Sequence, residues 1–254
     1  MRKSKIFSIV NQKGGVGKTT TAVNLAASLA FLGKKILLID LDAQANSSSG
    51  IGIKHNERFL TLYQVLKNFN SIEDVVIKTA FPNLNFIPSN LKISSIDIEI
   101  SNLSQRERIL SCSISKIRSQ YDYIFIDCPP SLSLLTMNAL VSSDEVIIPM
   151  ICDFYSLEGL SSLIYSIKNI EDNFNSNIKI AGILFTMYDK RNRLTEQVEH
   201  EVRSYLGDLV YKTNIPRNIK LAEAPSYGKP VLFYDKKCLG ALAYMDLAQE
   251  IMQY

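Results

Sequence analysis

Short apolar runs recur along the chain and alternate with longer segments of helical periodicity. The apolar runs fall at 6–10, 36–39, 123–126, 146–150 and 178–185. Most of them are continuously apolar, as is typical of parallel strands that are covered on both faces. The helical segments fall at 20–32, about 105–118, about 132–141, 157–173 and 195–206. This alternation of strand and helix predicts an α/β fold with a doubly wound, mostly parallel sheet and helices on both faces.

The rest of the chain adds one helix and one loop to this prediction. A final helix is expected over 239–252, where many apolar residues and few positive charges indicate packing against the core. The stretch 46–53 is rich in Ser and Gly, so we expect a mobile loop there. No internal repeat or low-complexity linker divides the 254 residues, and they are therefore predicted to form a single domain, 1–254.

The composition is that of a soluble globular protein, with 46% hydrophobic and 21% charged residues. The four cysteines lie apart without a C-x-x-C pair, so neither a disulfide framework nor a zinc site is predicted. The basic segment 1–5 is followed by too few apolar residues for a secretory signal, and no run approaches transmembrane length. We therefore expect a cytoplasmic protein.

The segment between the first strand and the first helix is a glycine-rich phosphate-binding loop. Its sequence is Lys13-Gly14-Gly15-Val16-Gly17-Lys18-Thr19-Thr20. Three glycines allow a tight turn, so that backbone N–H groups and the positive end of the following helix point at phosphates. In such loops the final lysine, here Lys18, lies among the β- and γ-phosphates, and the hydroxyl of Thr19 binds Mg²⁺. The loop departs from the ordinary pattern, because Gln12 replaces its first glycine and Lys13 adds a second lysine.

Two further segments bring carboxylates to the same edge of the predicted sheet. The first strand-end segment is Asp40-Leu41-Asp42-Ala43-Gln44, with two acids on one side of the strand. The second is Asp127-Cys128-Pro129-Pro130, in which the prolines force a turn after the aspartate. Acids beside a phosphate loop favour a role with metal and water over a buried ion pair. The sequence therefore predicts Mg²⁺-dependent phosphoryl chemistry.

These motifs, in this order, resemble those of the ParA/MinD class of P-loop NTPases, whose deviant Walker A loop contains a second lysine. The resemblance covers nearly the whole chain and implies ATP and Mg²⁺, since no guanine-specific N-K-x-D motif is present. It implies that Lys13 reaches across a homodimer interface to the partner's nucleotide, as an arginine finger acts in trans. Asp40 would help hold the Mg²⁺ shell, Asp127 would reach Mg²⁺ through water, and Asp42 would orient the attacking water.

The resemblance also assigns residues outside these motifs. Met187, Pro216 and Arg217 are expected to contact adenine. Ala43 stands where the class usually has proline, so the segment around it is expected to be looser.

A basic region follows residue 189. Between 190 and 237 there are ten Lys/Arg and six Asp/Glu, in a chain whose net charge is only +3. Charge alone does not distinguish a DNA site from a solvated surface. The segments 189–194 and 215–226 resemble the Soj-type chromosomal branch of the class, where such positions bind DNA without sequence preference. By that match Arg191 and Lys220 contact phosphates, and a lysine in place of the frequent arginine gives a weaker contact.

The function implied by the resemblance is that of a slow ATPase that binds DNA as an ATP-bound homodimer and acts in chromosome or plasmid partitioning. The implied partner is a ParB-like centromere-binding protein, and the expected place is the nucleoid. The nature of the cargo stays open.

Other readings of the same nucleotide loop remain. A MinD-like membrane ATPase would need a basic amphipathic C-terminal helix, whereas 248–254 carries one acid and no base, so no membrane binding is expected. An iron–sulfur carrier would need correctly spaced ligand cysteines, which the sequence lacks. A metabolic ligase or kinase would need a specific co-substrate pocket, which no motif in the sequence indicates.

Overall fold

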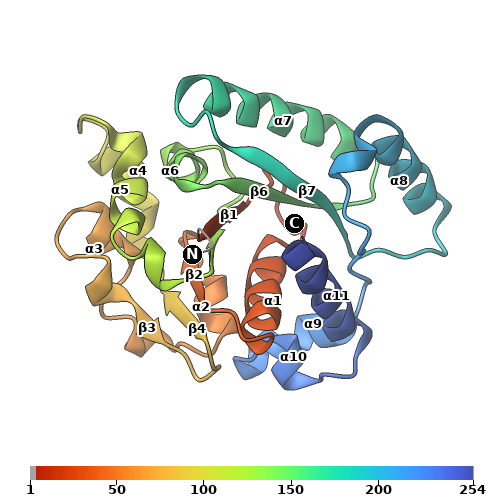
Figure 1. Cartoon of the computed structure of the whole chain (residues 1–254), viewed down its shortest axis with the longest axis horizontal. Coiled ribbons are helices and arrows are strands. Elements are labelled where there is room, and N and C mark those ends of the chain that lie inside the picture. The colour runs from red at the N-terminus through yellow and green to blue at the C-terminus, as the bar shows by residue number, and fades with distance from the viewer. Residues whose placement is uncertain (1–3, 254) are drawn as a thin grey trace.

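The computed structural model describes residues 4–253 and is built around a seven-stranded sheet (Figure 1). The strands are β1 (Lys5–Ile9), β2 (Ile36–Asp40), β3 (Ile77–Lys78), β4 (Leu84–Ile87), β5 (Tyr123–Asp127), β6 (Glu145–Ile151) and β7 (Lys179–Thr186). Their order is β3-β4-β2-β5-β1-β6-β7, and only β3 and β4 pair in antiparallel fashion. The predicted doubly wound, mostly parallel sheet is confirmed. Part of the basic N-terminal segment, residues 1–3, lies outside the described residues.

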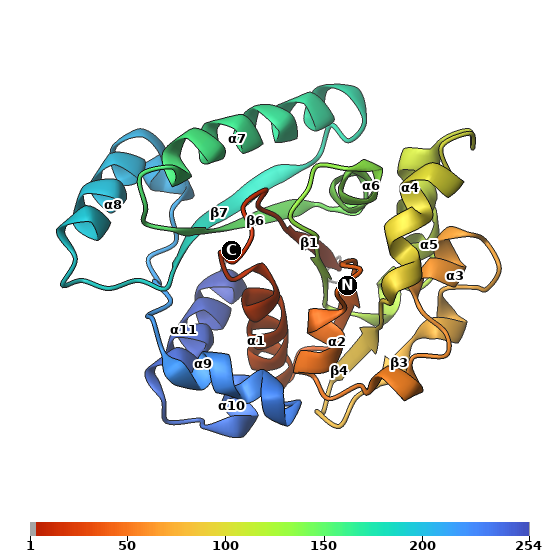
Figure 2. The same ribbon diagram turned by 180° about the vertical axis from the view of Figure 1, so that it is seen from behind.

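Helices cover both faces of the sheet, as predicted (Figures 1 and 2). They are α1 (Lys18–Phe31), α2 (Asn46–Gly50), α3 (Leu62–Leu66), α4 (Ile96–Glu99), α5 (Ile109–Ser115), α6 (Leu134–Ser142), α7 (Ser156–Asn173), α8 (Arg193–Leu206), α9 (Ile219–Glu223), α10 (Val231–Tyr234) and α11 (Leu239–Gln253). One apolar layer includes α6, α7 and α8, and the other includes α1, α10 and α11. The final helix therefore packs in the core, as its composition predicts.

Each central strand divides its side chains between these two layers. In β5, Ile124 and Ile126 pack into the layer of α6 and α7, whereas Tyr123 and Phe125 pack into the layer of α1 and α11. All four side chains are buried. Burial on both faces explains why the strands appear in the sequence as continuous apolar runs.

The position of β1 determines where a ligand can bind. The chain leaves β1 toward β2 on one side of it and later returns to β6 on the other side. In open α/β sheets, such a reversal of strand order opens a crevice outside the carboxyl ends of the strands. The loops that follow β1, β2 and β5 converge there, and these loops contain the three predicted motifs.

Some elements differ from the prediction. The strands β3 and β4 were not predicted, because two and four residues are too few to give a clear apolar run. The helix predicted over 105–118 is regular only between Ile109 and Ser115, with 3₁₀ turns on either side. Within residues 4–253, no helix combines the length and the apolar character needed to cross a membrane.

Candidate nucleotide and metal site

The glycine-rich loop joins β1 to α1 and is anchored by side-chain hydrogen bonds. The Asn11 side chain donates to the carbonyl oxygen of Pro149 on β6 (2.7 Å) and accepts from the backbone N–H of Lys13 (2.9 Å). Gly15 and Gly17 have positive φ angles of 73° and 85°, which favour glycine. α1 begins directly after Gly17, so its first N–H groups have no partners inside the helix. The loop therefore ends at a helix terminus suited to an anion.

The side chain of Lys18 is buried and folds back onto this loop. Its Nζ atom donates to the carbonyl oxygen of Lys13 at 2.9 Å. Burial lowers the pKa of the Lys18 ammonium group, while the nearby charges of Asp127, Cys128 and Asp42 act in the opposite direction. Lys18 thus lies within electrostatic reach of both acidic segments, although its contact with phosphate stays a prediction.

Asp40 and Asp127 end neighbouring strands, pair in register and are fully buried. Asp40 accepts hydrogen bonds from the backbone N–H and the hydroxyl of Ser48, at 2.9 and 2.8 Å. Asp127 accepts from the hydroxyl of Ser47 at 2.7 Å and from that of Thr19. Burial raises the pKa of both carboxyl groups, and the charge of Asp127 raises that of Asp40 further. The hydrogen bonds from the three hydroxyls oppose these shifts without cancelling them.

One oxygen of Asp127 is suited to a metal ion. Its Oδ1 atom is buried and has no hydrogen-bond partner among the described residues. A buried carboxylate oxygen without a donor is costly, and a cation would offset that cost. Mg²⁺ is commonly held by one or two carboxylates together with phosphate and water oxygens. Residues 4–253 contain no group of three or more acidic, His or Cys side chains able to hold a metal. The residues present therefore fit Mg²⁺ bound jointly with a nucleotide.

The serines that hold these carboxylates were missed by sequence reasoning. The stretch 46–53 was predicted as a mobile loop, and this is wrong for 46–50, which form the helix α2. Ser47 and Ser48 are completely buried in it, because their hydroxyls bind Asp127 and Asp40. A segment rich in Ser and Gly is an ordinary loop signal, so composition alone points away from a buried role.

Asp42 differs from Asp40 in its environment. β2 ends at Asp40, so the strand alternation that was expected to place both acids on one side does not extend to Asp42. The backbone N–H of Asp42 donates to Asp40 at 3.1 Å, while its own carboxylate accepts from the backbone N–H of Gln44 at 2.9 Å. The side chain is half-buried. A half-buried carboxylate can contact water, as its predicted role requires.

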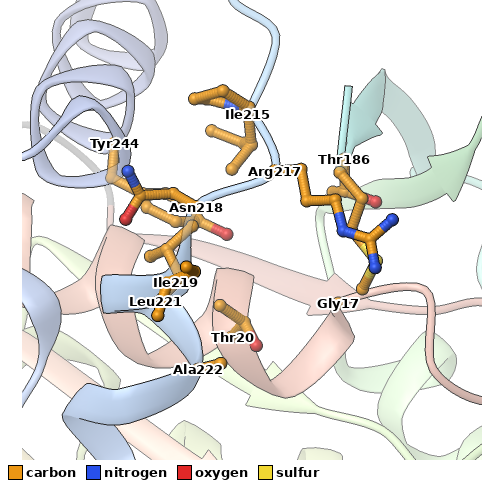
Figure 3. Close-up of a pocket in the computed structure, with 12 residues that line it drawn as sticks. Gly17, Thr20, Thr186, Ile215, Arg217, Asn218, Ile219, Leu221, Ala222 and Tyr244 are labelled. Atoms are coloured by element: carbon orange, nitrogen blue, oxygen red, sulfur yellow. The ribbon is translucent and has the colours of Figure 1, made fainter. Parts of the chain in front are cut away.

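A cavity of about 370 Å³ adjoins the phosphate loop (Figure 3). The three predicted adenine contacts, Met187, Pro216 and Arg217, all line it together with Gly17 of the loop. Figure 3 shows Arg217 extending over the pocket on the side where Gly17 lies. Helix α11 contributes Tyr244, which sequence reasoning missed because no local motif marks it. The cavity is thus placed to accept a base whose phosphates lie on the loop.

Comparison with known proteins identifies the family. A family profile described as an AAA domain matches residues 4–180. The chain is 46% identical over 250 residues to the chromosome partitioning protein ParA of Caulobacter vibrioides, covering 98% of this chain and 94% of that protein. It is 47% identical over 247 residues to the sporulation initiation inhibitor protein Soj of Bacillus subtilis, covering 97% and 98%. The chain belongs to the ParA/Soj family of partitioning proteins.

A solved structure supports the nucleotide assignment of this ParA/Soj-family fold. Cobyrinic acid a,c-diamide synthase from Mycobacterium smegmatis, solved with an ATP analogue and magnesium, is 27% identical and has a TM-score of 0.86. The match covers 98% of this chain and 95% of the other. A protein with a similar fold therefore binds an ATP analogue together with magnesium, which supports ATP and Mg²⁺ as the ligands of this fold.

The second lysine of the ParA/Soj loop, Lys13, forms an ion pair with Asp153, in the turn between β6 and α7. Asp153 also accepts from the hydroxyl of Ser156 at 2.6 Å. Burial works to raise the pKa of Asp153, but the hydrogen bonds from Lys13 and Ser156 outweigh it, so the pKa is lowered. The carboxylate that binds Lys13 is thus ionised at neutral pH.

The two predicted DNA contacts of the ParA/Soj chain, Arg191 and Lys220, each form an ion pair with an acidic residue of the same chain. Arg191 donates to both carboxylate oxygens of Asp189, at 2.9 and 2.7 Å. Lys220 pairs with Glu223 at 2.9 Å and lies over the ring of Tyr234, 5.6 Å from its centroid. Within residues 4–253, the ion pairs of these two cations are with Asp189 and Glu223 and not with Asp40 or Asp127. Their contact with DNA stays a prediction.

Proposed function

We propose that the chain is a single-domain, Mg²⁺-dependent ATPase that dimerises with ATP, binds DNA without sequence preference in that state and acts in chromosome or plasmid partitioning. The observation that carries the proposal is the meeting of the phosphate loop, the paired Asp40 and Asp127, and the base-sized cavity at one edge of the sheet. The close identity to ParA and Soj proteins supports the partitioning role.

Nucleotide binding would use the groups already described. The helix end after Gly17 and the ammonium group of Lys18 would bind the phosphates, and the 370 Å³ cavity would receive adenine. Thr19, Asp40 and Asp127 would hold Mg²⁺, which would neutralise charge on the phosphates.

Hydrolysis would depend on positioning more than on covalent chemistry. Asp42 is the acid in this region that is not fully buried, and it would orient the attacking water. Lys13 would leave Asp153 and contact the partner's nucleotide. A cation supplied in trans can contribute roughly 10³–10⁵ in rate, so a monomer would hydrolyse ATP slowly. Release from DNA and reset of the dimer would follow hydrolysis, stimulated by a ParB-like partner at the nucleoid in the cytoplasm.

Co-sedimentation with DNA tests the proposal. Wild-type protein, Lys13→Ala and Lys18→Ala are compared with ATP, ADP and no nucleotide. Wild type is expected to bind DNA only with ATP, Lys13→Ala to retain nucleotide binding but lose both the dimer and DNA binding, and Lys18→Ala to lose nucleotide binding itself. A Lys116→Ala variant, which changes an exposed lysine on another part of the surface, serves as the control. Normal ATP-dependent dimers of Lys13→Ala would refute the role of Lys13.

A further inference from the structure

Two loops far apart in the sequence touch through a pair of glycines. Gly52 follows α2 and Gly228 follows the 3₁₀ turn 224–227, and both have positive φ angles, of 82° and 62°. A Cβ atom on Gly52 would lie 2.8 Å from the carbonyl oxygen of Gly228, and one on Gly228 would lie 2.6 Å from the Cα atom of Gly52. No other residue type fits this contact without displacing the backbone. The two loops therefore pack closely against each other at this point.

A groove of about 650 Å³ lies between these loops, and its walls carry cations and hydroxyl groups. Lys54, His55 and Arg58 line it on one side, and Ser226 and Tyr227 line it on the other. None of the described residues that line the groove is acidic. The neighbouring Glu57 accepts a hydrogen bond from the backbone N–H of Lys54 at 3.0 Å.

The cations of the groove are not neutralised by ion pairs. In the part of the chain that the structure describes, neither Lys54 nor Arg58 has a carboxylate within ion-pair distance. The guanidinium group of Arg58 is held in place by the carbonyl oxygen of Ile53 and the hydroxyl of Ser49, at 2.8 and 3.0 Å. Lys54 is exposed. These groups combine fixed positive charge with free donors, which suits a phosphate.

The predicted DNA contacts show the opposite arrangement. Arg191 and Lys220 each pair with a carboxylate of their own chain, so a phosphate must displace Asp189 or Glu223 to reach them. Helix α9, which carries Lys220, leads directly into the loop that forms one wall of the groove. The groove therefore adds unpaired positive charge next to a surface whose own cations are paired.

We infer that this groove binds a phosphate of the DNA backbone and extends the DNA-binding surface beyond Arg191 and Lys220. The inference rests on the proposed DNA binding of the ATP-bound protein. It also places the DNA surface close to the nucleotide. Arg58 donates to Ser49, and the two serines before Ser49 hold the carboxylates of the magnesium site. The short helix α2 thus links the groove, through Ser49, to Asp40 and Asp127, through Ser48 and Ser47.

The salt dependence of DNA binding tests this inference. Labelled random-sequence duplex DNA is titrated with wild type, Lys54→Gln and Lys54→Glu in the presence of ATP and Mg²⁺ at several salt concentrations. Loss of one phosphate contact per protomer is expected to reduce the slope of log K against log salt by about 0.9 per protomer. Lys54→Glu is expected to weaken binding further than Lys54→Gln. Lys116→Gln, a change in another exposed lysine, is expected to keep the wild-type slope.

The outcomes separate the groove from the general proposal. Wild-type binding with an unchanged slope in Lys54→Gln would overturn the groove inference alone. Absence of ATP-dependent DNA binding by wild type would overturn both proposals. A second measurement follows thermal stabilisation of the ADP-bound protein by inorganic phosphate. Stabilisation that Lys54→Gln removes, with DNA binding unchanged, would assign the groove to a free anion and overturn the DNA inference.

Discussion

Lys13 and Asp153 form an ion pair within one chain, although the resemblance to ParA/MinD proteins gives Lys13 a role in the partner subunit. The two residues are 140 positions apart and meet because β6 returns beside β1. Their side chains are 38% and 33% exposed, so water screens the pair only in part. A lysine committed to this carboxylate must leave it before it can contact another nucleotide. If Lys13 acts across the dimer as proposed, Asp153 competes with dimerisation.

Asp153→Asn is expected to favour the ATP-bound dimer. Partly exposed ion pairs contribute about 0.2–1 kcal/mol each, and the dimer gives up one pair per protomer, so the dimerisation constant should rise by up to about thirtyfold. Sedimentation velocity with ATP across protein concentrations measures this change. Asp172→Asn, which alters an exposed ion pair at the far end of α7, is the control. The gain should vanish in Lys13→Ala/Asp153→Asn, and a gain that persists there would mean that Asp153 acts through another residue.

Ser48→Ala is expected to weaken the magnesium site and to destabilise the fold. The substitution removes the 2.8 Å hydrogen bond from the hydroxyl to Asp40, which is fully buried. Leaving a buried acceptor short of a donor costs about 1–3 kcal/mol. Urea unfolding and Mg²⁺-dependent ATP binding should both show the loss. Asn46→Ala, at an exposed position of the same helix, should change stability by less than about 0.5 kcal/mol. Equal effects of the two variants would contradict the assigned role of Ser48.

The stability of the metal-free protein is expected to fall as pH rises. Burial raises the pKa of Asp40 and Asp127 above the ordinary value of 3.8, so the folded chain holds these protons when the unfolded chain has lost them. Between the ordinary and the raised pKa the folded state binds more protons, and increasing pH therefore favours unfolding. Urea unfolding in the presence of a chelator, at pH values from about 5 upward, measures how the free energy of unfolding changes with pH. Asp40→Asn should flatten it, and a slope that is unchanged by this variant would assign the effect to other groups.

The sequence predicted the elements of the site that depend on local pattern. Continuous apolar runs reveal strands such as β5, and the acid after each run must lie at the sheet edge, which is how Asp40 and Asp127 could be placed. The contacts that complete the site are non-local. Ser47 and Ser48 donate to Asp127 and Asp40 because α2 packs against the ends of β5 and β2. The hydrophobic pattern of a Ser-rich stretch does not predict such a contact. The same holds for Tyr244, which lines the cavity beside the phosphate loop from the last helix.

Asp189→Asn is expected to strengthen DNA binding by the ATP-bound protein. Asp189 binds the guanidinium group of Arg191 through both carboxylate oxygens and so competes with phosphate for it. Removing the charge should raise DNA affinity several-fold at low salt, whereas Arg191→Glu should lower it by a larger factor. Fluorescence anisotropy with random-sequence duplex DNA measures both. Asp208→Asn removes an acid that forms no ion pair within residues 4–253 and serves as the control. If neither Arg191→Glu nor Asp189→Asn changes the DNA affinity, the loop that contains these residues is not part of the DNA interface.

Gly52→Ala is expected to destabilise the protein more than Gly33→Ala, although both glycines have nearly the same positive φ, of 82° and 84°. At Gly33 an added Cβ meets no atom within 4 Å. The substitution is therefore destabilising only because alanine disfavours the positive φ, by about 1–2 kcal/mol. At Gly52 the Cβ would also press on the carbonyl oxygen of Gly228, which adds about 1–3 kcal/mol of overpacking. Urea unfolding of the two variants isolates the contact between the loops. Equal losses would mean that the loops separate at little cost, and the groove between them would then have no fixed wall.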